Sequence, residues 1–141
     1  MNAFHTLFVH VVFQTQQHQP LIQQEYKVLL NEFFSEQISA DGYSVLTFCL
    51  MRDHVHVVLE YHIHLSLEEI VDQLKTASRN WVAHKSAGLS FEWSTDFYAI
   101  SFGHADLDSV FKILRKQQDY HLKASFADEL NDLLDYAEFP F

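Results

Sequence analysis

The spacing of hydrophobic residues changes along the chain and predicts a mixed α/β fold. Residues 4–13 are rich in Val, Phe and Thr and predict a first strand. Apolar side chains over residues 21–38 recur with the helical period of about 3.6, which predicts a helix. Two further β-rich runs, over residues 43–51 and 55–61, are separated by only three residues. We therefore expect a tight antiparallel connection between them.

A second helix is predicted by its start signal and its apolar stripe. Ser66 is followed three residues later by Glu69, which is the pattern of a capping box, so the helix is expected over residues 67–84. Helical periodicity gives the residues of its inward face as Ile70, Val71, Leu74, Ala77, Trp81 and Val82.

The C-terminal part adds one strand and two helices. We expect a strand over residues 97–102, a helix from Asp106 to about residue 122, and a short acidic helix over residues 126–136 capped by Ser125. The order is β-α-β-β-α-β-α-α. Two split β-α-β halves predict an α+β fold, namely a ferredoxin-like βαββαβ antiparallel sheet with helices on it and extra C-terminal helices.

Composition predicts one domain in a reducing compartment. A chain of 141 residues with 48% apolar content can bury one core, and three Gly and two Pro leave little material for linkers, so 1–141 is expected to be a single domain. The apolar stretches are too short for a bilayer, and residues 1–13 alternate instead of forming a signal-peptide core. A lone Cys49 excludes an internal disulfide. We expect a cytoplasmic protein without a membrane partner.

Charge is unevenly distributed. The net charge of −10 argues against a nucleic-acid partner, because phosphate binding normally rests on Lys and Arg. Residues 71–123, however, hold seven basic against six acidic side chains, so an anion-facing surface is expected there. The candidate nucleic-acid-binding residues are Lys75 and Arg79 on the second helix and Lys112, Arg115 and Lys116 on the third. A solvated helix face is the alternative for each of them.

His54 and His56 are the candidate metal ligands. They are two residues apart on a predicted strand, so both imidazoles project from one face and can offer nitrogens to one divalent ion. Two solvent-facing histidines on a strand are the alternative. His62 and His64 have the same spacing but fall at the strand end, where solvated loop histidines are the better interpretation.

The setting of this pair resembles a known family. The segment 51–59, Met-Arg-Asp-His-Val-His-Val-Val-Leu, is similar to the Asp-His-Val-His strand of single-tyrosine HUH transposases of small bacterial insertion sequences, a group that includes REP-associated relatives. The similarity extends over nearly the whole chain. Its other segments are Phe13-Gln14-Thr15, the helix with Leu74-Lys75, Ser78 and Trp81, Phe91-Glu92-Trp93, and a last helix with Gln117 and His121 followed by Ser125-Phe126 and Asp128-Glu129.

The resemblance implies a function and a ligand set. It implies a ferredoxin-like fold, a homodimer, single-stranded or hairpin DNA as partner, and Mg²⁺ or Mn²⁺ held by His54, His56 and Gln117. Such a set is chemically coherent, because a cation with two imidazoles, one amide oxygen and open positions can polarise a scissile phosphate. Without the resemblance, Gln117 would be read as an exposed helix residue with no role.

The chain departs from the family at the nucleophile. The family's tyrosine lies four residues before the Gln, which corresponds here to Ile113, and isoleucine has no group that can attack phosphorus. Tyr120, three residues after Gln117, lies on roughly the same helical stripe and is the substitute candidate. Tyr98 is expected to be a core or base-stacking residue. A second departure is Asp96, an acidic group in a turn where relatives usually have Gly.

Three hypotheses remain. The first is a transposase-like enzyme that cleaves and transfers single-stranded DNA strands with a relocated tyrosine. The second is a transposase-derived, non-catalytic DNA- or RNA-binding regulator, which Ile113 and the net charge of −10 favour. The third is an unrelated zinc hydrolase in which His54, His56 and a third histidine, His62 or His64, hold the ion.

Overall fold

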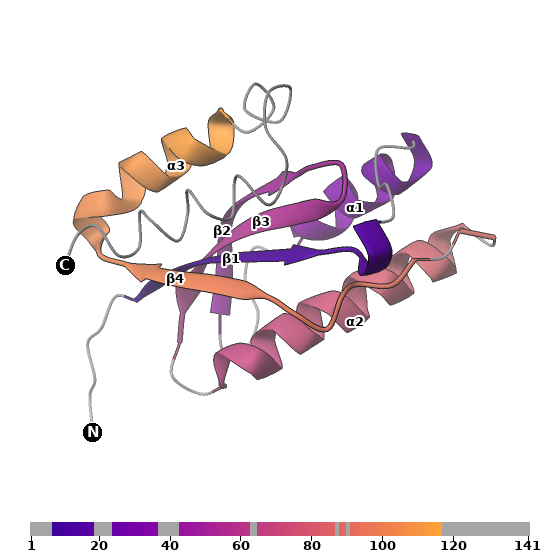
Figure 1. The fold of residues 1–141 in the computed structure, drawn as a ribbon, viewed down its shortest axis with the longest axis horizontal. Coiled ribbons are helices and arrows are strands. Elements are labelled where there is room, and N and C mark those ends of the chain that lie inside the picture. The colour runs from indigo at the N-terminus through magenta and orange to yellow at the C-terminus, as the bar shows by residue number, and fades with distance from the viewer. Residues whose placement is uncertain are drawn as a thin grey trace.

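A four-stranded antiparallel sheet forms the centre of the fold. In the computed structural model, which describes residues 7–18, 24–36, 43–62, 65–86, 88–89 and 91–116, the strands are β1 (Phe8–Gln14), β2 (Tyr43–Leu50), β3 (His54–Tyr61) and β4 (Tyr98–Phe102). They lie in the order β2-β3-β1-β4, with every neighbouring pair antiparallel (Figure 1). This is the strand order of a ferredoxin-like sheet and confirms the predicted fold class.

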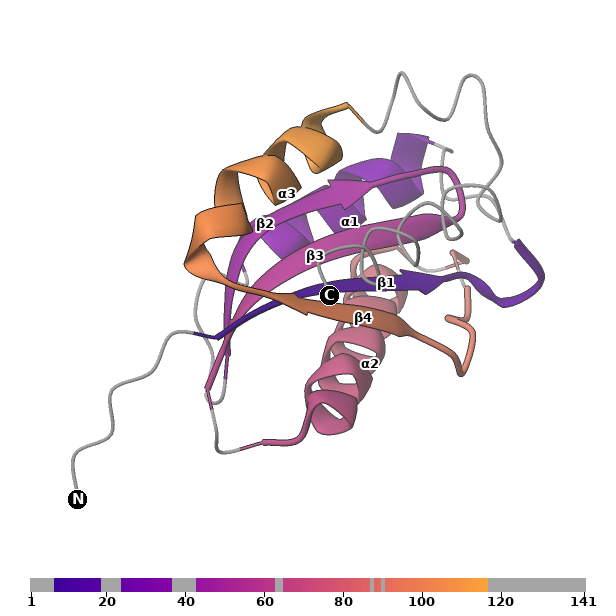
Figure 2. The same cartoon turned by 60° about the vertical axis from the view of Figure 1, so that its left-hand side comes forward.

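Helices cover both faces of the sheet. Two long helices, α1 (Gln24–Glu36) and α2 (Leu67–Lys85), pack on one face, and α3 (Leu107–Arg115) packs on the other (Figure 2). Short 3-10 turns, Gln16–His18 and His104–Asp106, follow β1 and β4. The predicted helix over 126–136 lies outside the described residues.

Two helix starts follow the sequence signals. The Ser66 hydroxyl accepts a hydrogen bond from the backbone N–H of Glu69 at 3.1 Å, so this serine caps α2. Asp106 is the residue before the first turn of α3, although its side chain makes no capping bond.

The alternation along β3 divides its side chains between two cores. Val55, Val57 and Leu59 are fully buried in the large cluster beneath α1 and α2. Val58 points to the opposite face and joins a smaller cluster with Val110 and Leu114 of α3. Because β3 is an inner strand with helices on both sides, both of its faces are apolar except at His54, His56 and, near the strand end, Glu60.

The inward face of α2 differs from the prediction at one position. Ala77 is exposed, and Ser78, one residue on, is fully buried instead. The reason is a specific hydrogen bond, because the Trp93 indole N–H donates to the Ser78 hydroxyl at 2.9 Å. Trp81 is only half-buried, with the Lys85 ammonium 4.6 Å from its ring centre.

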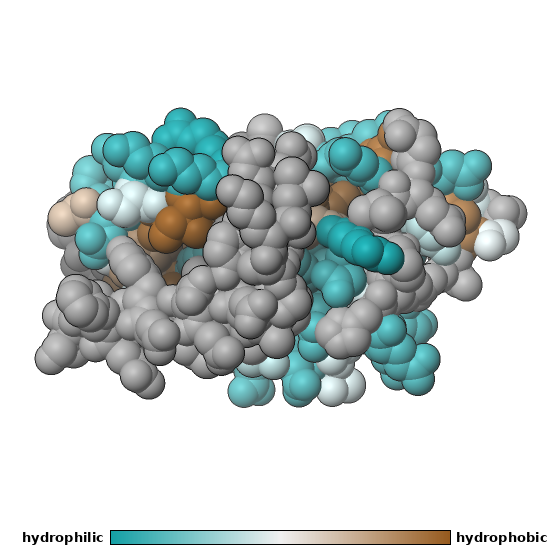
Figure 3. Space-filling model, turned by 45° about the horizontal axis from the view of Figure 1, so that its top comes forward, coloured by the Kyte–Doolittle hydropathy of each residue, from teal (hydrophilic) through white to brown (hydrophobic). Residues whose placement is uncertain are grey.

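Among the described residues, the exposed large hydrophobic side chains are Leu7, Val28 and Leu46. Among the residues coloured in Figure 3, hydrophobic surface appears as small separate areas between hydrophilic side chains. None of the helices within the described ranges combines the length and hydrophobicity that a membrane span requires.

The Ser78–Trp93 bond predicts a stability effect. Ser78→Ala keeps the side-chain volume nearly unchanged but leaves a buried indole N–H unsatisfied, so we expect the free energy of unfolding to fall by about 1–3 kcal/mol in urea titrations. In the Trp93→Phe background, where the donor is gone, the same substitution should cost less. Ser101→Ala, at an exposed position of β4, is the control, and we expect its free energy of unfolding to change by no more than about 0.5 kcal/mol. Equal costs in both backgrounds would contradict this role for the bond.

Candidate metal and nucleic-acid site

The two candidate metal ligands lie side by side in the middle of the sheet. His54 and His56 of β3 are 1% and 0% exposed, and their ring centres are 5.1 Å apart at an interplanar angle of 67°. They project from the face on which α3 packs, as the two-residue spacing predicted. Their burial excludes the interpretation as two solvent-facing histidines.

Asp53 fixes the orientation of the His54 ring. Its carboxylate Oδ1 lies 2.8 Å from His54 Nδ1. A carboxylate accepts hydrogen bonds, so Nδ1 carries the proton and Nε2 of the neutral ring carries the lone pair that a cation binds. The Asp53 backbone is held in turn, because its carbonyl accepts from both the backbone N–H and the hydroxyl of Thr15, at 2.8 and 3.2 Å.

His10 makes the corresponding contact with His56. Its Nε2 is 2.9 Å from His56 Nδ1, and the ring is 4% exposed. In the β1–β3 register His10 lies opposite Val58 and Val12 opposite His56, so the two histidines are diagonal neighbours on one face. His10 is not among the site residues predicted from the sequence. The available signal was a histidine in a strand whose flanking residues are apolar, but its partner is 46 positions away.

The third helix packs close to the pair. Val110 and Leu114 of α3 are buried against Val58 and against Cys49, which is the cross-strand partner of His56. Ile113, next to Leu114, is half-buried. Gln117 and Tyr120 lie outside the described residues, so their assignments as ligand and substitute nucleophile stay predictions.

Tyr98 lies on the same face as the histidines. It pairs with Val12 across the β1–β4 ladder, and Val12 pairs with His56 across the β1–β3 ladder, so Tyr98 is two strands away from the pair. The ring is half-exposed. Tyr98 is therefore not a fully buried core residue, and its base-stacking role stays a prediction.

The pair fits a divalent cation. Two imidazole nitrogens each about 2.1 Å from one ion place their ring centres on the order of 5 Å apart, as His54 and His56 are. In the part of the chain that the structure describes, no three His, Cys, Asp or Glu side chains come together as a metal site. His62 follows the end of β3, about 20 Å from His56 at roughly 3.3 Å per residue, so the zinc site with His62 is not supported. His64 is outside the described residues.

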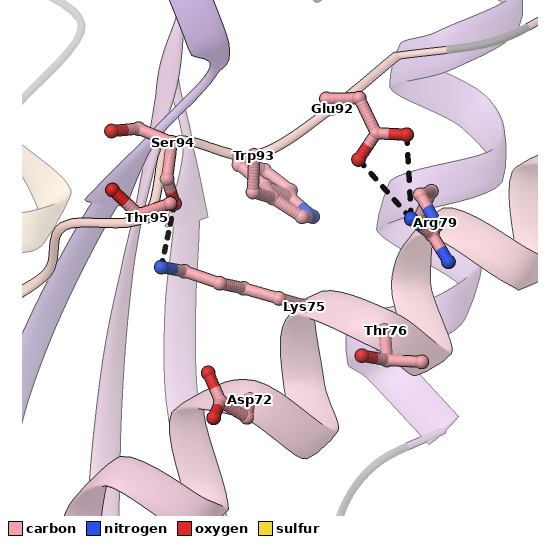
Figure 4. Close-up of a pocket in the computed structure, with 8 residues that line it drawn as sticks. All are labelled: Asp72, Lys75, Thr76, Arg79, Glu92, Trp93, Ser94 and Thr95. Atoms are coloured by element: carbon pink, nitrogen blue, oxygen red, sulfur yellow. Dashed lines mark hydrogen bonds and ion pairs between the residues drawn. The ribbon is translucent and has the colours of Figure 1, made fainter.

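Lys75 is engaged within the protein. Its ammonium donates to the backbone carbonyl of Ser94 at 2.7 Å (Figure 4). It also donates to the backbone carbonyl of Asp96 at 2.9 Å. Burial lowers the pKa of Lys75, and the nearby carboxylates of Asp72 and Asp96 oppose this shift. The side chain therefore ties α2 to the loop that leads into β4.

Arg79 is also paired, and the remaining basic candidates are exposed. Its guanidinium lies 3.3 and 3.2 Å from the two Glu92 carboxylate oxygens, on the rim of a cavity of about 230 Å³ beside Trp93 (Figure 4). By contrast, Lys112, Arg115 and Lys116, at the end of α3, are all exposed. Of the five predicted DNA-binding residues, Lys75 and Arg79 are therefore engaged within the protein. The other three are exposed at the end of α3.

Comparison with known proteins identifies similar chains. The family model described as "Transposase IS200 like" matches residues 3–117. A crystal structure of a candidate transposase from Deinococcus radiodurans is similar with a TM-score of 0.65 and 15% identity, covering 83% of this chain and 95% of that one. A REP-associated tyrosine transposase bound to a REP hairpin is similar with a TM-score of 0.57 and 11% identity, covering 86% of this chain and 74% of that one. Among curated proteins, no sequence matches significantly.

The internal role of Lys75 predicts that its loss affects stability. Lys75→Met removes the donor for two backbone carbonyls, one of them half-buried, and should lower the free energy of unfolding by about 1–2 kcal/mol. The matched control is Lys116→Met at an exposed position, for which we expect a change within about 0.5 kcal/mol. Chemical denaturation measures both, and equal stability of the two variants would show that the loop does not depend on Lys75.

Proposed function

The chain belongs to the IS200-like transposase family, and on that premise we propose that it binds hairpin or single-stranded DNA but does not cleave it with the side chain of residue 113 as nucleophile. The observation that carries the proposal is that two buried candidate metal ligands occur together with an isoleucine at the position that the resemblance assigns to the nucleophile. His54 and His56 are buried and oriented on the face where α3 packs, while α3 presents Ile113 where the family has its nucleophile.

The two histidines are proposed to hold Mg²⁺ or Mn²⁺, with Gln117 as the third ligand. When bound, a divalent cation supplies positive charge that polarises a phosphate and offsets charge on its oxygens. The protein's own contribution is to fix the rings. Asp53 and His10 each engage an Nδ1 atom, so neither ring can turn without breaking a hydrogen bond.

Strand cleavage requires a nucleophile that residue 113 does not supply. The Ile113 side chain contains only carbon and hydrogen, so no phosphotyrosine bond can form there. An active transposase using Tyr120 is the second candidate function. On the helix predicted from Asp106 to about residue 122, Tyr120 would stand about 10 Å along the axis from residue 113, so the substrate would have to bind in a shifted position. The described α3 ends at Arg115, earlier than predicted, so the place of Tyr120 stays a prediction.

A DNA partner is supported by a relative and by the position of the cations. A structurally similar chain is a REP-associated transposase bound to a REP hairpin. Here the exposed basic side chains at the end of α3, Lys112, Arg115 and Lys116, offer phosphate contacts on the helix that packs beside the histidine pair. A homodimer completes the proposal, as the resemblance implies.

DNA binding is expected to depend on α3 and on salt. We expect a labelled DNA hairpin to bind at about 50 mM salt and to lose at least tenfold in affinity by 200 mM, measured by fluorescence anisotropy. The triple variant Lys112→Gln, Arg115→Gln, Lys116→Gln should weaken binding by a further 10–100-fold, roughly. Lys85→Gln on α2 is the control and should bind like the wild type. No binding at low salt would contradict the proposed function.

Cleavage is expected to return when the tyrosine is restored. With Mn²⁺ and labelled single-stranded DNA, the wild type should form no covalent adduct, while Ile113→Tyr should form a 5′-phosphotyrosine link and release a 3′-hydroxyl. Denaturing gels show the adduct. His56→Ala in the Ile113→Tyr background should abolish it, because the cation site is lost. A wild-type adduct that disappears in Tyr120→Phe would establish the active enzyme instead.

A further inference from the structure

His10 and His56 form a buried hydrogen bond, and the proposed metal site requires that His56 be its donor. The atoms His10 Nε2 and His56 Nδ1 are 2.9 Å apart, a distance at which one nitrogen donates its proton and the other accepts. Neutral imidazole carries one N–H, so two arrangements satisfy the bond. They differ in what His56 presents at its other nitrogen.

In the first arrangement His56 donates from Nδ1, and its Nε2 carries a lone pair. In the second, His10 donates from Nε2, and His56 Nε2 carries a proton that blocks a cation. His54 has the same proton position as His56 in the first arrangement. The Nδ1 atom of His54 must donate to the Asp53 carboxylate, so the Nε2 atom of His54 carries the lone pair. The ring centres of His54 and His56 are 5.1 Å apart, and a cation held between them requires a lone pair on Nε2 of both rings.

We infer that His10 is a positioning residue, which accepts the Nδ1 proton of His56 and so keeps the His56 Nε2 lone pair available to a divalent cation. This inference rests on the proposed function of the histidine pair. His10 is suited to the role because it sits on β1, is 4% exposed, and reaches His56 diagonally across the ladder. The two ligands thus have different supports: a carboxylate from the adjacent residue for His54 and an imidazole from another strand for His56.

The first test measures cation affinity by isothermal titration with Mn²⁺. His10→Leu removes the acceptor and fills the site with an apolar group, and we expect a loss of 10–100-fold, roughly, as is typical when the partner of a ligating histidine is removed. His10→Gln restores an acceptor oxygen at similar reach and should bind within about threefold of the wild type. Phe8→Leu is the control, since Phe8 lies on the same face of β1 but stacks on Phe102.

The second test reads the tautomer of the metal-free wild type by ¹⁵N NMR of labelled histidines. We expect His56 to carry its proton on Nδ1, and a proton on Nε2 would overturn the assignment. This measurement decides the matter even if His10→Leu fails to fold. Wild-type protein that binds no Mn²⁺ would contradict the proposed metal site, whereas equal Mn²⁺ affinity of the wild type and His10→Leu would overturn only the role of His10.

Discussion

The register of β3 against β1 is the constraint on which the candidate site depends. A buried imidazole without a hydrogen-bond partner costs about 1–3 kcal/mol, so His54 and His56 can occupy the sheet interior only where partners meet them. The register supplies these partners, because it brings His10 diagonal to His56 and bonds the Asp53 carbonyl to Thr15 at the end of β1. A slip by one residue would turn both histidines into the opposite core.

The segments that carry the family resemblance serve mainly to hold the chain together. Trp93 donates to Ser78, the Lys75 ammonium binds the carbonyls of Ser94 and Asp96, and Arg79 pairs with Glu92. These contacts fasten the loop before β4 onto α2, and β4 then completes the sheet beside β1. Basic residues in a segment that carries the family resemblance are therefore not necessarily DNA contacts.

Within the described residues, local patterns predicted the elements, although α3 ends at Arg115 and not near residue 122. They did not predict contacts between residues distant in sequence. The alternation in β3 was sufficient to place His54 and His56 on one face, and Ser66 marked the start of α2. The partner of His56 could not be predicted, because it depends on which strands become neighbours. The error at Ala77 has a similar origin, since the burial of Ser78 depends on an indole 15 residues away. The hydrogen bonds of Lys75 within the protein could not be predicted either, because they depend on the path of the loop before β4.

The residues that pack α3 on the sheet are different from residue 113, the position at which the family has its nucleophile. The packing of α3 rests on Val110 and Leu114, which are 2% and 4% exposed, whereas Ile113 is only half-buried beside them. The buried contacts of Val110 and Leu114 that seat the helix on the sheet do not include the side chain at position 113. The support of the histidines is equally independent of residue 113, because it comes from Asp53 and His10. Under the proposed function, the loss of a nucleophile at position 113 would therefore leave the fold and the proposed cation site in place.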